Sequence, residues 1–293
     1  MAGCSDQNDG CSLSRRDFLK AAGLTAAGVA LGTYPMLRAF GAEEAGGPLA
    51  EESVAERGGE APEFSYDPST VYYAKPAPPD TKWAMVIDVK ACVGCRKCAW
   101  ACVKENNIGR DSGFTYIQLL EMEAGKVELE TANPYYTTGG DPEKWYLPVQ
   151  CMHCDDPPCV LNCPVKATRK EADGLLVQDY RKCIGCRACM INCPYHARHF
   201  NWKEPVVPAS EINRNPAVPM RLAGVVEKCT FCIHRIREGK AETRCTEVCP
   251  VRARKFGNVL DPNSEVAQLL ANRRLLFRLK EELGTEPSIY YVG

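Results

Sequence analysis

Two short apolar runs, each bounded by polar residues, predict strands in the middle of the chain. The first covers Trp83–Asp88 and the second covers Leu175–Asp179. Runs this short suit strands better than helices. Three residues separate each run from a group of closely spaced cysteines. This repeated order of strand and cysteines indicates two related modules.

The segment between the two runs contains a predicted hairpin at Phe114–Glu130. We expect its strands at Thr115–Leu119 and Val127–Leu129, with a turn at Ala124–Gly125. The hairpin is an insertion that either presents a surface to a partner or supports the core.

A C-terminal helix is predicted near the end of the chain. Asp261–Glu265 offers N-cap residues, and apolar residues recur at helical spacing over Val266–Leu283. Gly284 supplies the stop.

The N-terminus resembles a twin-arginine (Tat) export signal. Ser14–Lys20 reads S-R-R-D-F-L-K, and the following apolar stretch, Ala21–Leu37, is short and interrupted by glycines and a proline. We expect cleavage after Gly41 or Ala42. A basic cap on an ordinary N-terminal helix is the alternative. No later segment is long enough to span a membrane.

Composition narrows the function classes. The chain has 293 residues, and its 36 Lys and Arg nearly balance 37 Asp and Glu. A net charge of −1 provides no basic field, so non-specific nucleic-acid binding is disfavoured. Eighteen cysteines are far more than packing needs, which indicates metal ligands or disulfides.

Sixteen of the cysteines fall into four groups of four, and Cys4 and Cys11 have no assigned role. Groups one and three share the spacing C-x2-C-x2-C-x3-C, the bacterial ferredoxin pattern for ligating [4Fe-4S] clusters. The groups are, in order, Cys92, Cys95, Cys98 and Cys102; Cys151, Cys154, Cys159 and Cys163; Cys183, Cys186, Cys189 and Cys193; Cys229, Cys232, Cys245 and Cys249.

The residues beside the cysteines suit a cubane cluster, whose four iron corners need thiolates on tightly curled backbone. Gly94 and Gly185 permit a positive φ just before the second cysteine of their groups. A proline follows the last cysteine of groups two, three and four, where it suits the first turn of a departing helix. Group one has Val103 there instead.

Other interpretations remain open at this point. Group four alone could form a Cys4 zinc site. Disulfide pairing does not predict repeated two-residue spacings. His153 lies within group two, but four thiolates already serve four corners, so a packing or hydrogen-bonding role is favoured for it and for His196, His199 and His234.

Basic residues are frequent around the motifs. Four oxidised [4Fe-4S] centres, each with four thiolates, add a formal charge of about −8, so nearby cations would offset their field and tune their potentials. A solvated basic face is the alternative. The residues concerned are Arg96, Lys97, Lys166, Arg169, Arg181, Lys182, Arg187, Arg198, Lys228, Arg235 and Arg237.

Four stretches make a family recognisable. They cover Cys151–Cys159, Cys193–Arg198, Val226–Cys232 and Phe256–Pro262. Together with the order of the four groups, they resemble the iron–sulfur electron-transfer (beta) subunits of the molybdopterin oxidoreductase superfamily. That family includes dimethyl sulfoxide, polysulfide and tetrathionate reductase subunits and the NrfC-like type. The resemblance covers about Trp83–Gly293.

The resemblance implies an α+β fold of two tandem bacterial-ferredoxin-like dicluster modules, with a β-hairpin insertion, an extended N-terminal strap and a C-terminal helix. It also implies four [4Fe-4S] clusters with ligands exchanged between groups. His196 stands where many relatives have glycine, which leaves the geometry after Cys193 open. The implied ligand sets are Cys92, Cys95, Cys98 and Cys249; Cys102, Cys229, Cys232 and Cys245; Cys151, Cys154, Cys159 and Cys193; Cys163, Cys183, Cys186 and Cys189.

We divide the chain into five parts on this basis. Residues 1–42 form the Tat signal, and residues 43–80, rich in Glu, Gly and Pro, form a linker or strap. Residues 81–150 hold the first motif and the insertion. Residues 151–223 form the second ferredoxin-like module, and residues 224–293 complete the first module and carry the C-terminal helix.

The resemblance further implies an exported electron-transfer subunit with no catalytic residues of its own. Its expected partners are an NrfD-type integral membrane subunit and a molybdopterin-type catalytic subunit or a multihaem cytochrome, at the periplasmic side of the cytoplasmic membrane. Three alternatives remain. They are a subunit of a respiratory complex without a molybdopterin enzyme, of the sulfate-reducer or alternative complex III type, a free polyferredoxin carrier, and a multi-zinc structural protein.

Overall fold

A computed structural model describes residues 75–272 and 276–293. The predicted Tat signal, its cleavage site and the first part of the predicted linker lie outside the described residues. The last residues of that linker, 75–80, contain no helix or strand. None of the described helices is long and apolar enough to cross a membrane.

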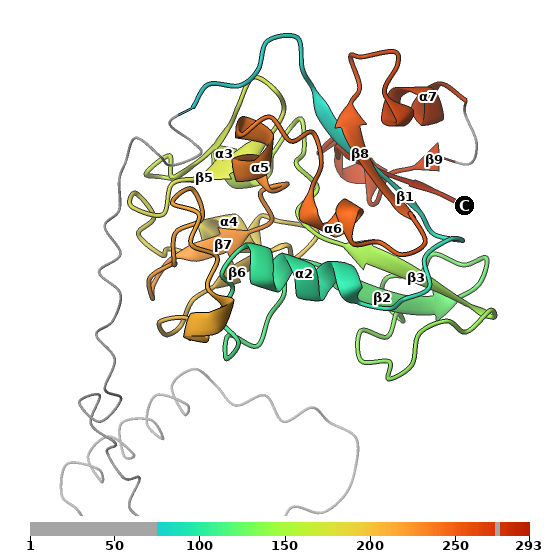
Figure 1. Cartoon of the computed structure of the whole chain (residues 1–293), viewed down its shortest axis with the longest axis horizontal. Helices are drawn as coiled ribbons and strands as arrows, with labels where there is room; N and C mark the ends of the chain where they lie inside the picture. Colours follow the sequence, from blue (N-terminus) through green and yellow to red (C-terminus); the bar gives the residue numbers. More distant parts are fainter. Residues whose placement is uncertain (1–74, 273–275) are drawn as a thin grey trace, which may run out of the picture. The chain divides into compact units, whose positions relative to one another are not determined.

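A four-stranded sheet joins the beginning and the end of the described chain (Figure 1). β1 (Trp83–Asp88) pairs antiparallel with β8 (Arg254–Asn258) and parallel with β10 (Ile289–Val292). β9 (Leu276–Phe277) pairs with β10 at the edge. β1 is the strand predicted from the first apolar run, and its continuous apolar sequence reflects burial on both faces.

The two faces of β1 pack against different neighbours. Met85 and Ile87 belong to the main core, whereas Val86 packs on Val266 of α7 (Glu265–Ala271). β1 leads into cysteine group one, and β8 follows group four. Because the two strands are antiparallel, their pairing carries both groups to the same end of the sheet.

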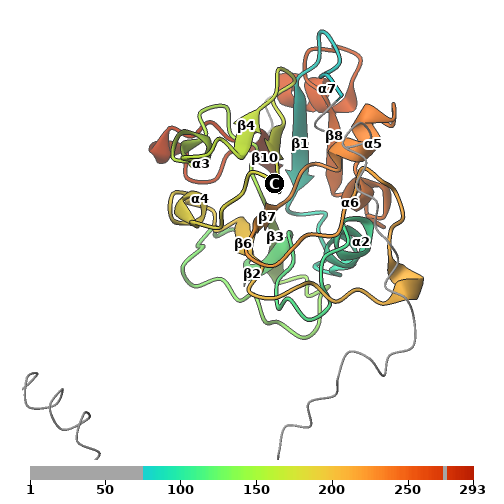
Figure 2. The ribbon, with the colours of Figure 1, turned by 90° about the vertical axis from the view of Figure 1, so that its left-hand side faces the viewer.

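Groups one and four also meet through helices. α2 (Lys97–Glu105) carries the last two cysteines of group one, and α6 (Arg244–Glu247) carries the third cysteine of group four. The two helices pack together and lie side by side in Figures 1 and 2. α5 (Ile233–Arg237) begins directly after Cys232.

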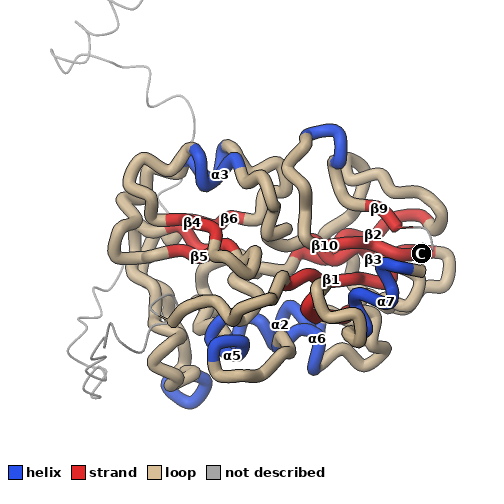
Figure 3. The backbone as a smooth tube through the Cα atoms, turned by 90° about the horizontal axis from the view of Figure 1, so that it is seen from above, coloured by secondary structure: helices blue, strands red, loops and turns tan. Residues whose placement is uncertain are grey.

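The central part of the chain forms two small units that repeat one pattern of a short helix followed by two strands. β5 contains the second predicted strand, and the helices of the two units pack against each other. Figure 3 shows their strands at the opposite end of this part of the molecule from β9. The units are α3 (Pro158–Leu161) with β4 (Thr168–Lys170) and β5 (Leu176–Gln178), and α4 (Ala188–Ile191) with β6 (Arg198–Phe200) and β7 (Val226–Lys228).

The insertion forms a two-stranded sheet, but the predicted pairing is wrong. β2 (Gln118–Glu123) pairs with β3 (Lys144–Val149), not with Val127–Leu129. The chain does turn after Glu123, where Lys126 N–H donates to the Glu123 carbonyl at 3.2 Å. β3 wins because it buries Leu147 completely, whereas Val127 stays exposed.

The predicted C-terminal helix is correct at its start and wrong in its length. Ser264 caps α7, its hydroxyl accepting from Ala267 N–H at 3.0 Å, but the helix ends at Ala271. Phe277 instead pairs with Tyr291 in the sheet and stacks on its ring. Sheet pairing therefore buries apolar residues that the helical spacing assigned to α7. Gly284, with φ of 64°, ends a short 3-10 turn, Glu281–Leu283. A second 3-10 turn, Ala209–Glu211, lies in the loop between β6 and β7.

Candidate functional site

All sixteen cysteines of the four groups are free thiols, so no disulfide forms among the described cysteines. Ten of them are buried and four are half-buried. The two exposed thiols, Cys95 and Cys186, occupy equivalent positions in groups one and three. The interior of the protein is therefore rich in thiols that do not bond to each other.

The loops of groups one and three have the same backbone geometry. Gly94 and Gly185 have φ of 65° and 69°, and the residues at Arg96 and Arg187 are left-handed at 56° and 60°. A Cβ at Gly185 would lie 2.2 Å from the Gly224 carbonyl oxygen. Glycine is therefore required here both by its positive φ and by the close approach of another chain segment.

The last cysteines of groups two, three and four lie in turns of one kind. In each, the third residue after the cysteine is left-handed and its N–H donates to the cysteine carbonyl at 3.2 Å. A positive φ ends a helical turn, so each turn leads into a strand and the expected departing helices are wrong. The three left-handed residues are Lys166, His196 and Arg252. His196 thus keeps the same turn geometry as its two counterparts.

Group one differs because it has no proline after its last cysteine. α2 continues past Cys102 to Glu105, and it places Cys98 and Cys102 on its buried face. Asn106 caps the helix and its Nδ2 lies 3.0 Å from the Cys102 carbonyl oxygen and 3.4 Å from Cys102 Sγ. An amide therefore donates to a thiol where backbone N–H groups serve the other motifs.

The first set of thiols lines one small cavity. Burial raises the pKa of Cys98 to about 12, while Arg254 acts in the opposite direction. Such thiols become thiolates when a metal or cluster binds them. The cavity contains all four cysteines of the first implied ligand set, Cys92, Cys95, Cys98 and Cys249, and is also lined by Arg254.

The second set is wholly buried. Burial raises the pKa of Cys102 well above its usual value, and repulsion from Cys229, Cys232 and Cys245 raises it further. Thr243 Oγ1 lies 3.2 Å from Cys245 Sγ. Four thiols from α2, α6 and the loop before α5 are thus electrostatic neighbours.

The third and fourth sets lie in the repeated units. Burial raises the pKa of Cys154 to about 12, with further contributions from its neighbours Cys151, Cys159 and Cys193. In the fourth set, Cys189 is an electrostatic neighbour of Cys183. Backbone N–H groups reach the remaining sulfurs of this region: Ala167 donates to Cys163 at 3.2 Å and Val226 donates to Cys183 at 3.5 Å.

The four sets follow one another in a series. Cys98 of the first set is an electrostatic neighbour of Cys245 in the second. Cys229 of the second set neighbours Cys151 in the third. Cys189 of the fourth set neighbours Cys159 in the third. The exposed thiols, Cys95 and Cys186, belong to the two end sets.

Buried cations provide the test of whether these thiols suit an anionic group. Arg198, Lys228 and Arg254 are at most 3% exposed, and within the described part of the chain no carboxylate forms an ion pair with any of them. Nε of Arg198 and of Arg254 have no hydrogen-bond partner among the described residues. Unpaired buried cations are costly, so this arrangement fits anionic clusters held by the thiolates.

The histidines have other partners, as the sequence favoured. His153 is buried and stacks on Phe231 with ring centroids 3.9 Å apart. Its Nδ1 accepts from Leu176 N–H at 3.0 Å and its Nε2 lies 3.1 Å from the Cys229 carbonyl oxygen. His234 Nε2 lies 2.8 Å from Glu105 Oε1. His199 stacks on an aromatic ring.

Sequence reasoning missed Arg254, although a signal for it exists. Arg198 and Arg254 both end a Cys-Pro-x-x-Ala-Arg motif, at Cys193–Arg198 and Cys249–Arg254. Each arginine begins a strand, β6 or β8, and its side chain turns back toward the thiols. The repeat would have placed both arginines at one equivalent position.

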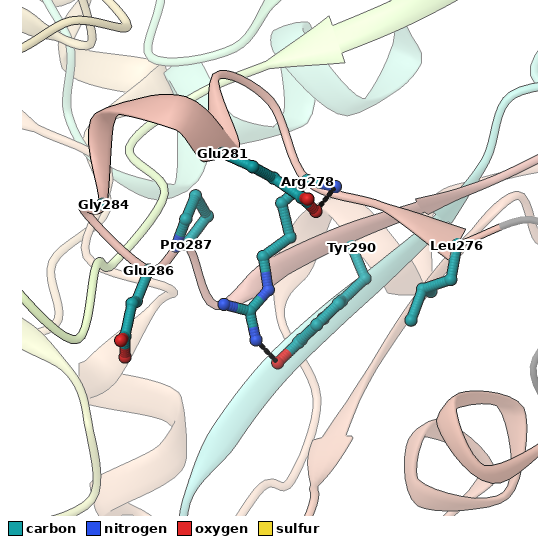
Figure 4. A pocket seen from close by; sticks show the side chains of 7 residues that line it. All are labelled: Leu276, Arg278, Glu281, Gly284, Glu286, Pro287 and Tyr290. Atoms are coloured by element: carbon teal, nitrogen blue, oxygen red, sulfur yellow. Dashed lines mark hydrogen bonds between the residues drawn. The ribbon is translucent and has the colours of Figure 1, made fainter.

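Another cavity lies away from the cysteines, at the C-terminal segment (Figure 4). Arg278 Nη2 donates to Tyr290 Oη there at 2.7 Å, and Arg278 N–H donates to Glu281 Oε1 at 2.8 Å. None of the sixteen described thiols lines this cavity. The thiol sets are therefore the site that the structure supports.

Comparisons with known proteins agree with the geometry. Residues 142–215 and 182–253 match two models described as 4Fe-4S dicluster domains. Residues 12–32 match the twin-arginine translocation signal, which confirms the predicted Tat signal. Two dicluster domains and the complete cysteine groups give the chain four [4Fe-4S] clusters.

Three relatives cover most of the chain. The menaquinone reductase iron-sulfur cluster-binding subunit of Nitratidesulfovibrio vulgaris is 40% identical over 238 residues, 72% of this chain and 89% of the relative. One selenate reductase subunit of Mesobacillus selenatarsenatis is 40% identical over 227 residues, 73% and 72% of the two chains. One tetrathionate reductase subunit of Salmonella typhimurium is 33% identical over 217 residues, 73% and 74%. The chain belongs to the family of iron–sulfur electron-transfer subunits that contains these relatives.

Proposed function

We propose that the four thiol sets hold the clusters as the family resemblance implies. The cavity lined by all four cysteines of the first set supports the exchange of Cys249 into group one. The electrostatic neighbours of Cys102 support its exchange into group four. In the same way, the neighbours of Cys154 support the exchange of Cys193 into group two. For Cys163 the support is the packing of α3 against α4.

The series of sets is the observation that carries the function. Each bound cluster accepts and releases one electron, and the neighbouring sets form a continuous path with one exposed thiol at each end. The chain itself supplies the ligands, the hydrogen bonds to sulfur and the insulating core. Electrons therefore enter at one end of the series and leave at the other.

The partners follow from the family and from the export signal. The Tat signal supports a location on the periplasmic side of the membrane. An NrfD-type integral membrane subunit then contacts one end of the series, and a molybdopterin-type catalytic subunit or a multihaem cytochrome contacts the other. Relatives named as subunits of selenate and tetrathionate reductases support the catalytic partner.

A second candidate function has its own support. The relative from Nitratidesulfovibrio vulgaris is named as a subunit of a menaquinone reductase. On that model, the chain serves a respiratory membrane complex that lacks a molybdopterin enzyme, and the electrons pass between a quinone-reactive subunit and a cytochrome.

Purification of the complex from native membranes tests the proposal. We expect the chain to copurify with an integral membrane subunit and a molybdenum-containing subunit. Copurification with cytochromes and no molybdenum selects the second candidate. A chain that elutes alone, without any partner, contradicts both and supports a free carrier.

A further inference from the structure

Three buried cations in the core are not paired with any carboxylate, although carboxylates neutralise many surface cations of the same chain. The side chains are those of Arg254, Lys228 and Arg198, at 3%, 0% and 3% exposure. No ion pair joins them to the described acidic residues. What surrounds these cations is cysteine sulfur and neutral hydrogen-bond acceptors.

Arg254 lies between the first and second thiol sets. It lines the cavity formed by the first set, and its electrostatic neighbours include Cys98 of the first set and Cys245 of the second. Its Nη2 donates to Gln150 Oε1 and lies 3.3 Å from Met85 Sδ. Nε and Nη1 have no partner among the described residues.

Arg198 holds the equivalent place between the third and fourth sets. Its Nη2 lies 3.0 Å from Cys159 Sγ of the third set, and Cys189 of the fourth set is also an electrostatic neighbour. The same nitrogen donates to Thr168 Oγ1 at 3.0 Å, and Nη1 donates to Gln178 Oε1 at 3.2 Å. The position after Cys-Pro-x-x-Ala thus places an arginine at a junction in both modules.

Lys228 lies between the second and third sets, where the two modules meet. Its Nζ donates to the Cys229 carbonyl at 2.8 Å and to the Leu176 carbonyl. Its electrostatic neighbours are Cys229 of the second set and Cys151 and Cys159 of the third. One buried cation therefore occupies each of the three junctions.

We propose that Arg254, Lys228 and Arg198 set the reduction potentials of the clusters in pairs, each cation raising the potentials of the two clusters beside it. Reduction makes a cluster more negative, so a nearby positive charge favours the reduced state. Burial keeps water and salt from screening that charge. The inference rests on the proposed ligand sets, because these define the junctions.

Redox titration followed by electron paramagnetic resonance (EPR) of the anaerobically prepared full-length protein tests the proposal. The charge-removing variants are Arg254→Gln, Lys228→Met and Arg198→Gln. Each should lower two of the four midpoint potentials, by a tenfold or larger change in the oxidised-to-reduced ratio, which is 59 mV for a one-electron centre. The series predicts which pairs move: the Lys228 variant should share one cluster with each arginine variant, and the arginine variants should share none.

Matched variants separate charge from packing. Arg254→Lys and Arg198→Lys keep the charge and should restore most of the shift. Arg252→Gln removes a cation two residues from Arg254 whose side chain is 80% exposed, and Arg169→Gln removes one from β4 whose side chain is 39% exposed. Both should leave all four potentials in place, because solvent screens them.

Each outcome decides the proposal. If a glutamine variant loses iron while the lysine variant keeps it, the charge is needed for the anionic clusters and the proposal is supported. If both lose iron equally, the arginine acts through shape and the proposal fails at that junction. Four clusters with unchanged potentials also overturn it. A wild-type protein without clusters instead contradicts the proposed function, so the two failures are distinct.

Discussion

At the scale of single residues, the site depends on backbone positions that few side chains tolerate and on thiols that are neutral without iron. Burial raises the pKa of Cys98, Cys154 and Cys229 to about 12. Such thiols are protonated at neutral pH and are poor nucleophiles until a cluster binds them. The protein stabilises the bound thiolates with N–H donors and buried cations instead of with solvent.

Gly185 gives a test at this scale. Gly185→Ala should destabilise the protein by about 2 kcal/mol or more, because a left-handed alanine is strained and its Cβ would meet the Gly224 carbonyl oxygen at 2.2 Å. Thermal unfolding of the anaerobic protein and its iron content measure the effect. Gly239→Ala is the control, since Gly239 also has a positive φ but no atom lies within 4 Å of an added Cβ. Equal effects of the two variants would contradict the close-approach argument.

At the scale of secondary-structure elements, short motifs act as ligand loops and long-range strand pairing brings them together. β1 and β8 carry groups one and four to one place, and α2 packs against α6. The insertion β2–β3 covers the first motif, where Tyr146 of β3 contacts the position of Gly94. The insertion therefore supports the core in addition to any surface that it presents.

The corrected pairing of the insertion makes a specific prediction. Leu147→Ala should lower the stability of the protein by about 2–5 kcal/mol, because Leu147 is completely buried. Val127→Ala should change it by less than about 0.5 kcal/mol, since Val127 is 41% exposed and outside the sheet. Comparison of their thermal unfolding under anaerobic conditions measures both. A larger loss for Val127→Ala would favour the hairpin predicted from the sequence.

At the scale of the whole molecule, the four thiol sets form a series with the buried second and third sets in the middle. Groups that are distant in sequence share one set, so the first module closes only when the C-terminal part of the chain folds back. The order of the series explains why the end sets contain the exposed thiols.

Serine variants test the exchange of ligands between groups. Cys249→Ser and Cys95→Ser should alter the same EPR signal of the reduced protein, because both thiols line one cavity. Cys245→Ser, only four residues away in sequence from Cys249, should alter a different signal. If Cys249→Ser instead altered the signal that Cys245→Ser alters, the proposed sets would be wrong.

The sequence predicted what depends on neighbouring residues. The cysteine spacings, β1, β5, the cap at Ser264 and the glycines at positive φ all follow from local chemistry. The pairing of β2 with β3 and the end of α7 depend on which distant segment buries more apolar surface. The position of Arg254 beside the first set likewise arises from the pairing of β8 with β1. Local patterns do not contain these long-range choices.

Metal and sulfide analysis of anaerobically purified full-length protein tests the central claim most directly. Four [4Fe-4S] clusters predict about sixteen iron atoms and about sixteen acid-labile sulfides per chain, with little zinc. A colourless, iron-free protein, or one with near-stoichiometric zinc and little iron, would contradict the account.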